Sequence, residues 1–306
     1  MDDKDWALLV DQLKNGDCTP LVGPWVSGER APTHVRDAYA APRGPSFLNR
    51  DESGGDVTYP TIADRRSPFL RERIAHDLLA VPPPDFNDPR EPHALLASLP
   101  LPVYLTTNFD GFLVTALHNA GRAAARDVCP WYPGAIRPGP DDSAYLFPTS
   151  DEPLVYHLHG SIEDPRSLVV TEEDHLEFLL GLAMDRGSDD QRIIPTRVLP
   201  ALTTRPLLFM GYDLSDWTFR FLFHGLLRTV AAVAPGRHVS LQLPPPAGRD
   251  DAAGRAQAER YLADYFGHWN VSVFWGTTAQ FCGELDERLT GQRRRDDGFP
   301  APDGGT

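Results

Sequence analysis

The stretch PLVYHLHGSIEDPRSLVVTEED, residues 153–174, places polar residues directly after an apolar run. The three apolar residues from Leu154 onward predict a buried strand, because such runs are typical of parallel sheets. His157 and His159 follow, and strand alternation predicts that both rings lie on one face before Gly160 ends the strand. Open α/β sheets bind ligands at the carboxyl ends of their strands. This stretch therefore predicts the edge of a binding site.

Three other apolar runs in the chain are followed by glycine or polar residues in the same way. The four segments are residues 23–27, 106–110, 157–161 and 211–216. In a parallel sheet these strand ends share one edge, so they can converge on one ligand. Each segment alone has an ordinary explanation, such as a helix cap or a hydrogen-bonded core histidine. Their repetition after successive strands favours a common site.

Strand patterns alternate with helix patterns along the chain. Strands are predicted at residues 18–22, 103–106, 126–129, 154–158, 167–170, 238–243 and 271–275, with another directly before residue 211. Helices are predicted near residues 6–13, 69–81, 92–99, 111–120, 172–184, 191–203, 216–230, 251–267 and 278–290. This order predicts an α/β protein with a Rossmann-like, mainly parallel sheet and helices on both faces.

The domain organisation expected from these patterns is simple. Residues 1–292 are predicted to form a single domain, because no linker or internal repeat separates its parts. Residues 28–99 are predicted to be an inserted irregular and helical lobe, since the first part is rich in Gly, Pro and Asp. Residues 293–306 are predicted to be a disordered tail because they are polar and glycine-rich.

Composition argues against several functional classes. The chain has 29 basic and 43 acidic side chains and a net charge of −14, which disfavours direct binding of nucleic acid. No apolar run approaches the roughly 18 residues that cross a membrane, and the acidic amino end is unlike a signal peptide. We therefore expect a cytoplasmic protein. Cys18, Cys129 and Cys282 are far apart in sequence, which predicts core thiols and no metal site.

Five motifs together resemble the bacterial sirtuin-like family, in which a Rossmann-like domain hydrolyses NAD. They are CTPLVG, LTTNFDGFL, YHLHGSIEDPRSLVVTEED, LLFMGYDLSDWTFRFLF and SVFWGTTAQF, and the similarity runs from about Cys18 to about Leu289. The resemblance implies that NAD is bound as substrate and that its bond between nicotinamide and ribose is broken. It also implies a defence effector that depletes NAD against phage, regulated by homo-oligomerisation or by a partner defence protein.

The resemblance also implies roles for particular residues. Asn108 would position the ribose or an attacking water, and Asp110 would orient the nicotinamide-ribose end. His159 would act as general base toward a ribose hydroxyl. The resemblance assigns no role to His157, which we expect to be structural, for example bonded to a carbonyl. The remaining NAD-binding residues that it implies are Gly23, Ser27, Thr106, Thr107, Gly160, Gly211, Tyr212, Asp213, Ser215 and Asp216.

Two features of the sequence depart from the family pattern. The two CxxC pairs of the lysine-deacylating sirtuins are absent, which disfavours protein deacylation. The first loop reads VGPWVSGER, with Pro24 and Trp25 where the family usually has small residues. Three interpretations remain open: the phosphates sit differently, with Gly28 and Arg30 compensating; Trp25 stacks on a ring of NAD; or Trp25 fills the pocket. In the last case the domain would be a sensor or scaffold that binds NAD or ADP-ribose without cleaving it.

Overall fold

The computed structural model describes residues 1–24, 26, 69–135, 148–183, 193–212, 222, 237–242, 269–296 and scattered positions between 256 and 267. Within these residues seven strands form one sheet in the order β3-β4-β2-β1-β5-β6-β7, and every neighbouring pair is parallel. The strands are β1 (Thr19–Val22), β2 (Val103–Thr106), β3 (Ala125–Val128), β4 (Leu154–His157), β5 (Leu207–Met210), β6 (His238–Gln242) and β7 (Val271–Trp275).

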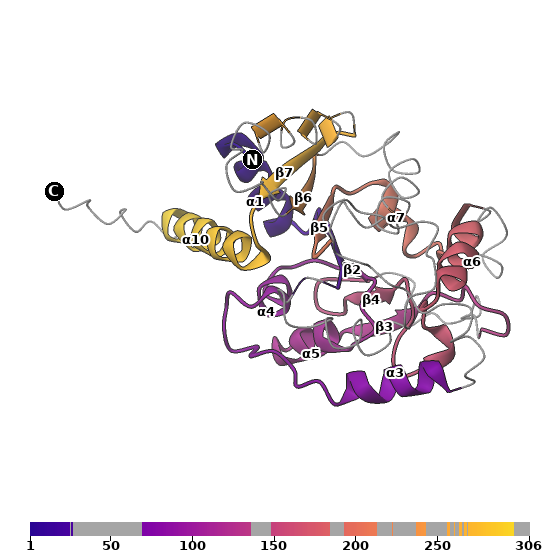
Figure 1. The fold of residues 1–306 in the computed structure, drawn as a ribbon. Helices are drawn as coiled ribbons and strands as arrows, with labels where there is room; N and C mark the ends of the chain where they lie inside the picture. Colours follow the sequence, from indigo (N-terminus) through magenta and orange to yellow (C-terminus); the bar gives the residue numbers. More distant parts are fainter. Residues whose placement is uncertain are drawn as a thin grey trace.

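Helices surround this sheet (Figure 1). They are α1 (Asp3–Lys14), α3 (Leu70–Leu79), α4 (Pro92–Ala97), α5 (Phe112–Asn119), α6 (Glu172–Ala183), α7 (Leu199–Thr203) and α10 (Thr278–Asp296), with a 3-10 helix, η3 (Pro165–Ser167). The first helix shows how local sequence sets its boundary. Asp2 and Asp5 form a reciprocal capping box, in which each carboxylate accepts the other residue's backbone N–H.

Alternation along the strands builds a separate core on each face of the sheet. In β2, Val103 and Leu105 join the core that includes Phe178 of α6. Tyr104, which lies between them, joins the opposite core with Trp6 of α1. Both faces are therefore buried, as apolar runs in parallel strands predict. The predicted Rossmann-like α/β fold with helices on both faces is confirmed.

The strand order places a topological switch point beside β1. The chain first builds β2, β3 and β4 on one side of β1 and then crosses to β5 on the other side. In open α/β sheets, ligands bind outside the carboxyl ends of the strands at such a point. Those ends carry Gly23, after β1, and Gly211, after β5.

Several predicted elements differ from the structure. Residues 167–170 form no strand, because η3 and an irregular segment occupy this place. Within the predicted helix at residues 191–203 only α7 is helical among the described residues, since Pro200 fits its first turn and Pro195 cannot extend the helix backward. α10 continues to Asp296, beyond the end of the helix predicted at residues 278–290. The helix predicted at residues 216–230 lies almost wholly outside the described residues.

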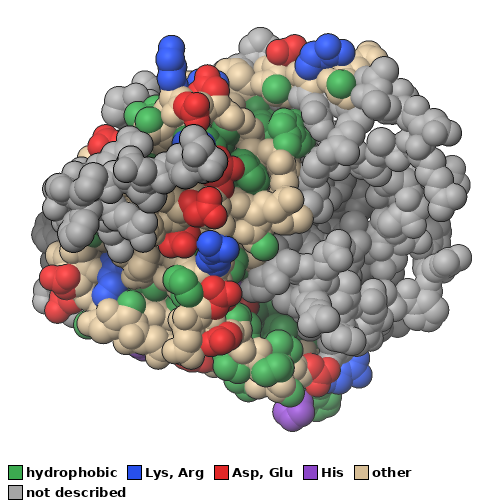
Figure 2. Space-filling view, turned by 90° about the vertical axis from the view of Figure 1, so that its left-hand side faces the viewer, with side chains coloured by type: hydrophobic (Ala, Val, Ile, Leu, Met, Phe, Trp, Pro, Cys, Tyr) green, Lys and Arg blue, Asp and Glu red, His purple; other side chains and the backbone are tan. Residues whose placement is uncertain are grey.

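The described surface reflects the acidic composition. Figure 2 shows acidic side chains gathered down the middle of one face, with separate basic side chains beside them. On the carboxyl-terminal helix, Asp286 and Glu287 are paired with Arg90, with N–O distances of 3.7 and 3.6 Å. Among the described residues, none of the helices has the length and apolar character that a membrane span requires. The three cysteines are buried, as predicted, and none of them forms a disulfide.

Candidate functional site

Hydrogen bonds to one carbonyl oxygen connect the carboxyl ends of β1, β2 and β5. The oxygen of Val22 accepts bonds from Thr106 Oγ1 at 3.1 Å, from the Thr107 N–H at 3.0 Å and from the Tyr212 hydroxyl at 3.2 Å. The hydroxyl groups of Thr107 and Tyr212 are also 3.0 Å apart. Three of the predicted strand ends are therefore held together as one unit, as the sequence led us to expect.

The glycines at the switch point are in direct backbone contact. A Cβ atom on Gly23 would lie 2.6 Å from the Gly211 oxygen, and one on Gly211 would lie 2.4 Å from the Val26 nitrogen. Gly211 also has a φ of +77°, which side chains rarely adopt. Only glycine fits either position. The backbones after β1 and β5 therefore lie in direct contact at the place where open α/β sheets bind ligands.

The unusual first loop begins with a tight turn. The Val26 N–H donates to the Gly23 oxygen at 3.2 Å, so Pro24 directly follows the first residue of a four-residue turn. Proline is favoured at this position because its φ is already correct. Val26 returns to the core and is 2% exposed. Pro24 is therefore compatible with the fold, whereas Trp25, Ser27, Gly28 and Arg30 lie outside the described residues and their three interpretations remain open.

Asn108 lies in the loop after β2, with its backbone bonded on both sides. Its N–H donates to Thr106 Oγ1 at 2.9 Å, and its carbonyl oxygen lies 3.0 Å from Nδ1 of His157. Its side-chain oxygen Oδ1 is buried and accepts no hydrogen bond from the described residues. An unpaired buried acceptor is costly in a folded protein. Oδ1 therefore calls for a donor such as a water or a ligand hydroxyl.

Asp110 lies two residues further along the same loop. Its Oδ1 accepts the Phe112 N–H at 3.0 Å, which connects the carboxylate to the first turn of α5. Burial raises the pKa of Asp110 above its ordinary value of 3.8; the charge interaction with His93 opposes this rise and that with Glu91 adds to it. Asp110 is partly buried, so its charge acts more strongly on nearby groups than the charge of an exposed carboxylate.

His159 lies just beyond β4, which ends at His157. Its ring packs edge-on against His175 and Phe178 of α6, with centroid distances of 5.3 and 4.9 Å. The prediction that His157 and His159 share a face is therefore wrong, because the strand ends before the alternation reaches His159. Burial, and then the charge of His175, hold the pKa of His159 well below 6.5. The imidazole is thus neutral at pH 7 and can accept a proton.

The loops after β2 and β4 are directly connected. The Ile162 N–H donates to the Phe109 oxygen at 2.9 Å, and the strands that precede these loops are neighbours in the sheet. Asn108, Asp110 and His159 therefore belong to one connected edge, together with Thr106, Thr107, Gly160, Gly23, Gly211 and Tyr212. Of the other predicted site residues, Ser27, Asp213, Ser215 and Asp216 lie outside the described residues.

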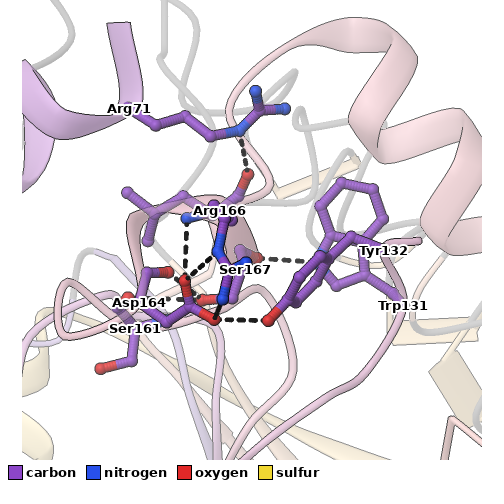
Figure 3. Close-up of polar contacts among 8 residues, drawn as sticks. Arg71, Trp131, Tyr132, Ser161, Asp164, Arg166 and Ser167 are labelled. Carbon is purple, nitrogen blue, oxygen red and sulfur yellow. Dashed lines mark hydrogen bonds and ion pairs between the residues drawn. The ribbon is translucent and has the colours of Figure 1, made fainter. Parts of the chain in front are cut away.

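The segment that follows His159 is held by hydrogen bonds within itself and to Trp131 and Tyr132 (Figure 3). The Ser161 N–H donates to Ser167 Oγ at 2.9 Å, and Trp131 Nε1 donates to the Ser167 oxygen at 2.7 Å. Asp164 accepts hydrogen bonds from Tyr132 and Arg166. The Val169 N–H then donates to the His159 oxygen at 2.9 Å, so this segment fixes the backbone of the candidate base.

A buried acid–histidine pair behind Asp110 was not identified from the sequence. Nδ1 of His93 donates to Glu91 Oε1 at 2.7 Å, and the His93 ring lies 6.2 Å from that of Phe112. Glu91 Oε2 also caps α4 by accepting the Ala94 N–H at 2.7 Å. The spacing EPH ahead of an apolar helix was the available signal, because a buried charge needs a partner.

Substitution of His93 and substitution of Glu91 should shift the pKa of Asp110 in opposite directions. We expect His93→Gln to raise the pKa further, because it removes the charge interaction that lowers it. Glu91→Gln should lower the pKa, because it removes a negative charge. Carbon-13 NMR titration of the Asp110 carboxyl group measures both. Glu152→Gln, at an exposed position, should leave the pKa unchanged, and shifts of the same sign in both variants would contradict the arrangement.

The described residues contain no group of three or more histidine, cysteine or acidic side chains placed to hold a metal ion. At this edge the described residues supply the imidazole of His159, the amide of Asn108 and the carboxylate of Asp110. These groups can accept a proton, hold a water or hydroxyl group and stabilise a positive charge, respectively.

The parallel sheet, its switch point and the polar edge define a Rossmann-like protein with one candidate ligand site. The family model of the SIR2-like domain matches residues 102–268, which is more than half of the chain. This protein therefore belongs to the SIR2-like domain family. The expected sirtuin-like relationship is confirmed.

Similar curated proteins carry the name NAD(+) hydrolase ThsA. The protein from Enterococcus faecium is 26% identical over 126 residues, which is 41% of this chain and 22% of the relative. The protein from Acinetobacter baumannii (strain 532279) is 24% identical over 130 residues, or 42% of this chain and 23% of the relative. The matched region thus spans less than a quarter of the length of these relatives.

Proposed function

We propose that this protein is an NAD hydrolase that releases nicotinamide and ADP-ribose. The observation that carries the proposal is the buried Oδ1 of Asn108 at the polar edge of the sheet, which has no hydrogen-bond partner among the described residues. Asp110 lies in the same loop, and His159 lies beyond the neighbouring strand. Membership of the SIR2-like family and the names of the ThsA relatives support the same activity.

The three side chains suit the cleavage of a glycosidic bond to a positively charged ring. Nicotinamide leaves as a neutral molecule, and positive charge develops on the ribose. Oδ1 of Asn108 can accept a hydrogen bond from the water that attacks the ribose or from a ribose hydroxyl. His159 is neutral at pH 7 because burial lowers its pKa, so its ring can take a hydroxyl proton.

Asp110 supplies the opposite charge in this scheme. Its carboxylate is fixed by the Phe112 N–H, so it needs no reorganisation as charge develops. Because Asp110 is partly buried, its attraction for a developing cation is less screened than at an exposed position. The groups of Glu91 and His93 behind it set how readily it ionises. We therefore assign Asp110 the stabilisation of the ribose cation.

We also infer a biological role from the resemblance. An NAD hydrolase of this kind would act in the cytoplasm as a defence effector, depleting NAD in a phage-infected cell. Such an activity must be off in an uninfected cell. Self-association or binding of a partner defence protein would therefore switch it on.

The second candidate function is binding of NAD or ADP-ribose without cleavage. Pro24 favours it, because the first turn after β1 loses a backbone N–H that could otherwise bind a phosphate. Release of nicotinamide distinguishes the two candidates, since a sensor or scaffold would bind the ligand and leave it intact.

The test is nicotinamide release from NAD by the wild type and by Asn108→Ala and His159→Ala, across a range of protein concentrations. We expect release by the wild type and a fall of about 10²–10³-fold or more in each variant. A rate per molecule that rises with concentration would support activation by self-association. Asn119→Ala and His76→Ala, at exposed positions, should keep the wild-type rate.

Three outcomes would contradict the proposed activity or its assignment to this site. Folded wild-type protein that releases no nicotinamide at any concentration, but binds NAD in calorimetry, would favour the binding function. Equal release by the wild type and both site variants would show that the cleavage occurs elsewhere. Loss of an acyl group from a peptide, dependent on NAD, would indicate deacylation instead.

A further inference from the structure

His157 is a buried histidine that the proposed chemistry does not use. It is the last residue of β4 and is 1% exposed. Its Nδ1 lies 3.0 Å from the backbone oxygen of Asn108. Since a carbonyl oxygen has no proton, Nδ1 must carry the hydrogen and donate it. This fixes the tautomer of the ring.

The surroundings of His157 keep the ring neutral. Burial is the main cause that lowers its pKa to about 4, and the positive charge of Arg126 on β3 contributes in the same direction. The carbonyl groups of Asn108 and Gly160 oppose the shift. Nε2 of the neutral ring is therefore a lone-pair acceptor. It is buried and has no partner among the described residues.

The bond from His157 is one of several that set the path of the Asn108 loop. Ile162, from the segment after β4, donates its N–H to the next carbonyl, that of Phe109, at 2.9 Å. The Asn108 N–H is bonded to Thr106 Oγ1 at 2.9 Å. The consecutive carbonyls of Asn108 and Phe109 are thus both bonded to the segment of residues 157–162, which includes His159. Of these two bonds, the one from His157 comes from a side chain and the one from Ile162 comes from the backbone.

We propose that His157 is a positioning residue of the candidate site, whose Nδ1–H fixes the Asn108 carbonyl and thereby the direction of the Asn108 side chain. The inference rests on the proposed function only for its effect on catalysis. A histidine that merely filled space could be replaced by any side chain of similar volume. A histidine that positions the loop can be replaced only by a donor that reaches the same oxygen.

This difference can be tested with two substitutions. In His157→Asn the side-chain NH₂ group lies close to the place of Nδ1–H and keeps a donor, whereas His157→Leu removes it. Hydrogen exchange of the backbone amides of residues 107–110 reports the loop directly. We expect up to roughly tenfold faster exchange in His157→Leu, the effect of one lost hydrogen bond, and near wild-type exchange in His157→Asn.

A second buried histidine provides a matched control. His238 on β6 is 2% exposed, and its Nδ1 accepts the Leu207 N–H at 2.9 Å, away from the Asn108 loop. His238→Leu should also destabilise the protein, as judged by thermal unfolding. It should not selectively speed exchange in residues 107–110. Loss of stability and loss of loop position are thereby separated.

The kinetic arm measures nicotinamide release. We expect kcat of His157→Leu to fall about 10–100-fold with KM little changed, since a displaced Asn108 costs orientation more than binding. His157→Asn should recover most of this loss. Equal loop exchange in the wild type and His157→Leu, or loss without rescue by His157→Asn, would overturn the proposal. If the wild type released no nicotinamide, the proposed function would fail, but the exchange arm would still decide the role of His157 in the loop.

Discussion

Gly160→Ala is expected to lower the free energy of unfolding by about 2–6 kcal/mol. A Cβ atom on Gly160 would lie 2.1 Å from the Ser167 oxygen and 2.4 Å from the Ser167 carbon, both of them backbone atoms. Gly160 also has a φ of +96°, which adds backbone strain for any other residue. Strain of this kind and overpacking each cost about 1–3 kcal/mol. Urea denaturation followed by circular dichroism measures the sum.

Gly121→Ala separates the two contributions. Gly121 has a φ of +79°, but a Cβ atom there would meet nothing within 4 Å. It should therefore show the cost of strain alone, about 1–3 kcal/mol. The difference between the variants is then the cost of the collision with Ser167. Equal losses would mean that the segment of residues 160–171 moves aside without cost.

The collision also has a consequence for the candidate site. The Ser167 oxygen already accepts a hydrogen bond from Trp131 Nε1, so it cannot move away from Gly160 without breaking that bond (Figure 3). His159 directly precedes Gly160, and its oxygen is bonded to the Val169 N–H. We therefore expect Gly160→Ala to displace His159 and to reduce nicotinamide release, even where the protein is still folded.

Much of the fold follows from the sequence because the strands are buried on both faces. Continuous apolar runs such as LLFM at residues 207–210 leave little alternative to a parallel strand, and the glycines after them mark the edge. The same logic placed Asn108 and His159 at neighbouring strand ends. Alternation failed for His157 and His159 because it requires the strand to continue, and Leu158 already belongs to a turn.

What the sequence did not predict depends on contacts between distant residues. Arg122 donates hydrogen bonds to the oxygens of Leu99 and Leu101 at 2.7 and 2.6 Å, and nothing in the local pattern distinguishes it from a surface arginine. The pair of Glu91 and His93 is local in sequence, but its effect on the pKa of Asp110 depends on a residue in another loop. Local patterns set the elements, whereas interactions between elements become visible only in the folded chain.

The stability of the protein is expected to fall steeply between pH 6.5 and pH 4. Burial lowers the pKa of both His157 and His238 from the ordinary 6.5 to about 4. Because the folded-state pKa is the lower one, the unfolded chain binds more protons in this interval. The contribution to stability is therefore complete above pH 6.5 and is lost as the pH falls to about 4. Each histidine accounts for roughly 3 kcal/mol, or about 1.4 kcal/mol per pH unit.

Substitutions that cannot be protonated in this range should flatten the dependence. In His238→Gln the side-chain oxygen can still accept the Leu207 N–H, and in His157→Asn the side chain can still donate to the Asn108 oxygen. Urea denaturation at several pH values should show a slope reduced by about 1.4 kcal/mol per pH unit in each variant. His76→Gln, at an exposed position, should keep the wild-type slope. Equal slopes in all four proteins would show that the two buried rings do not set the acid sensitivity.

The acid sensitivity bears directly on how the activity must be measured. His159 is also neutral in the folded protein because burial lowers its pKa, so it takes up a proton only well below pH 6.5. A fall in nicotinamide release in acid therefore has two sources to separate: unfolding driven by His157 and His238, and titration of a group in the site such as His159 or Asp110. His238→Gln distinguishes these causes, since it should extend activity to lower pH if unfolding is limiting. If the activity of His238→Gln fell at the same pH as that of the wild type while the variant stayed folded, a group in the site itself would be titrating.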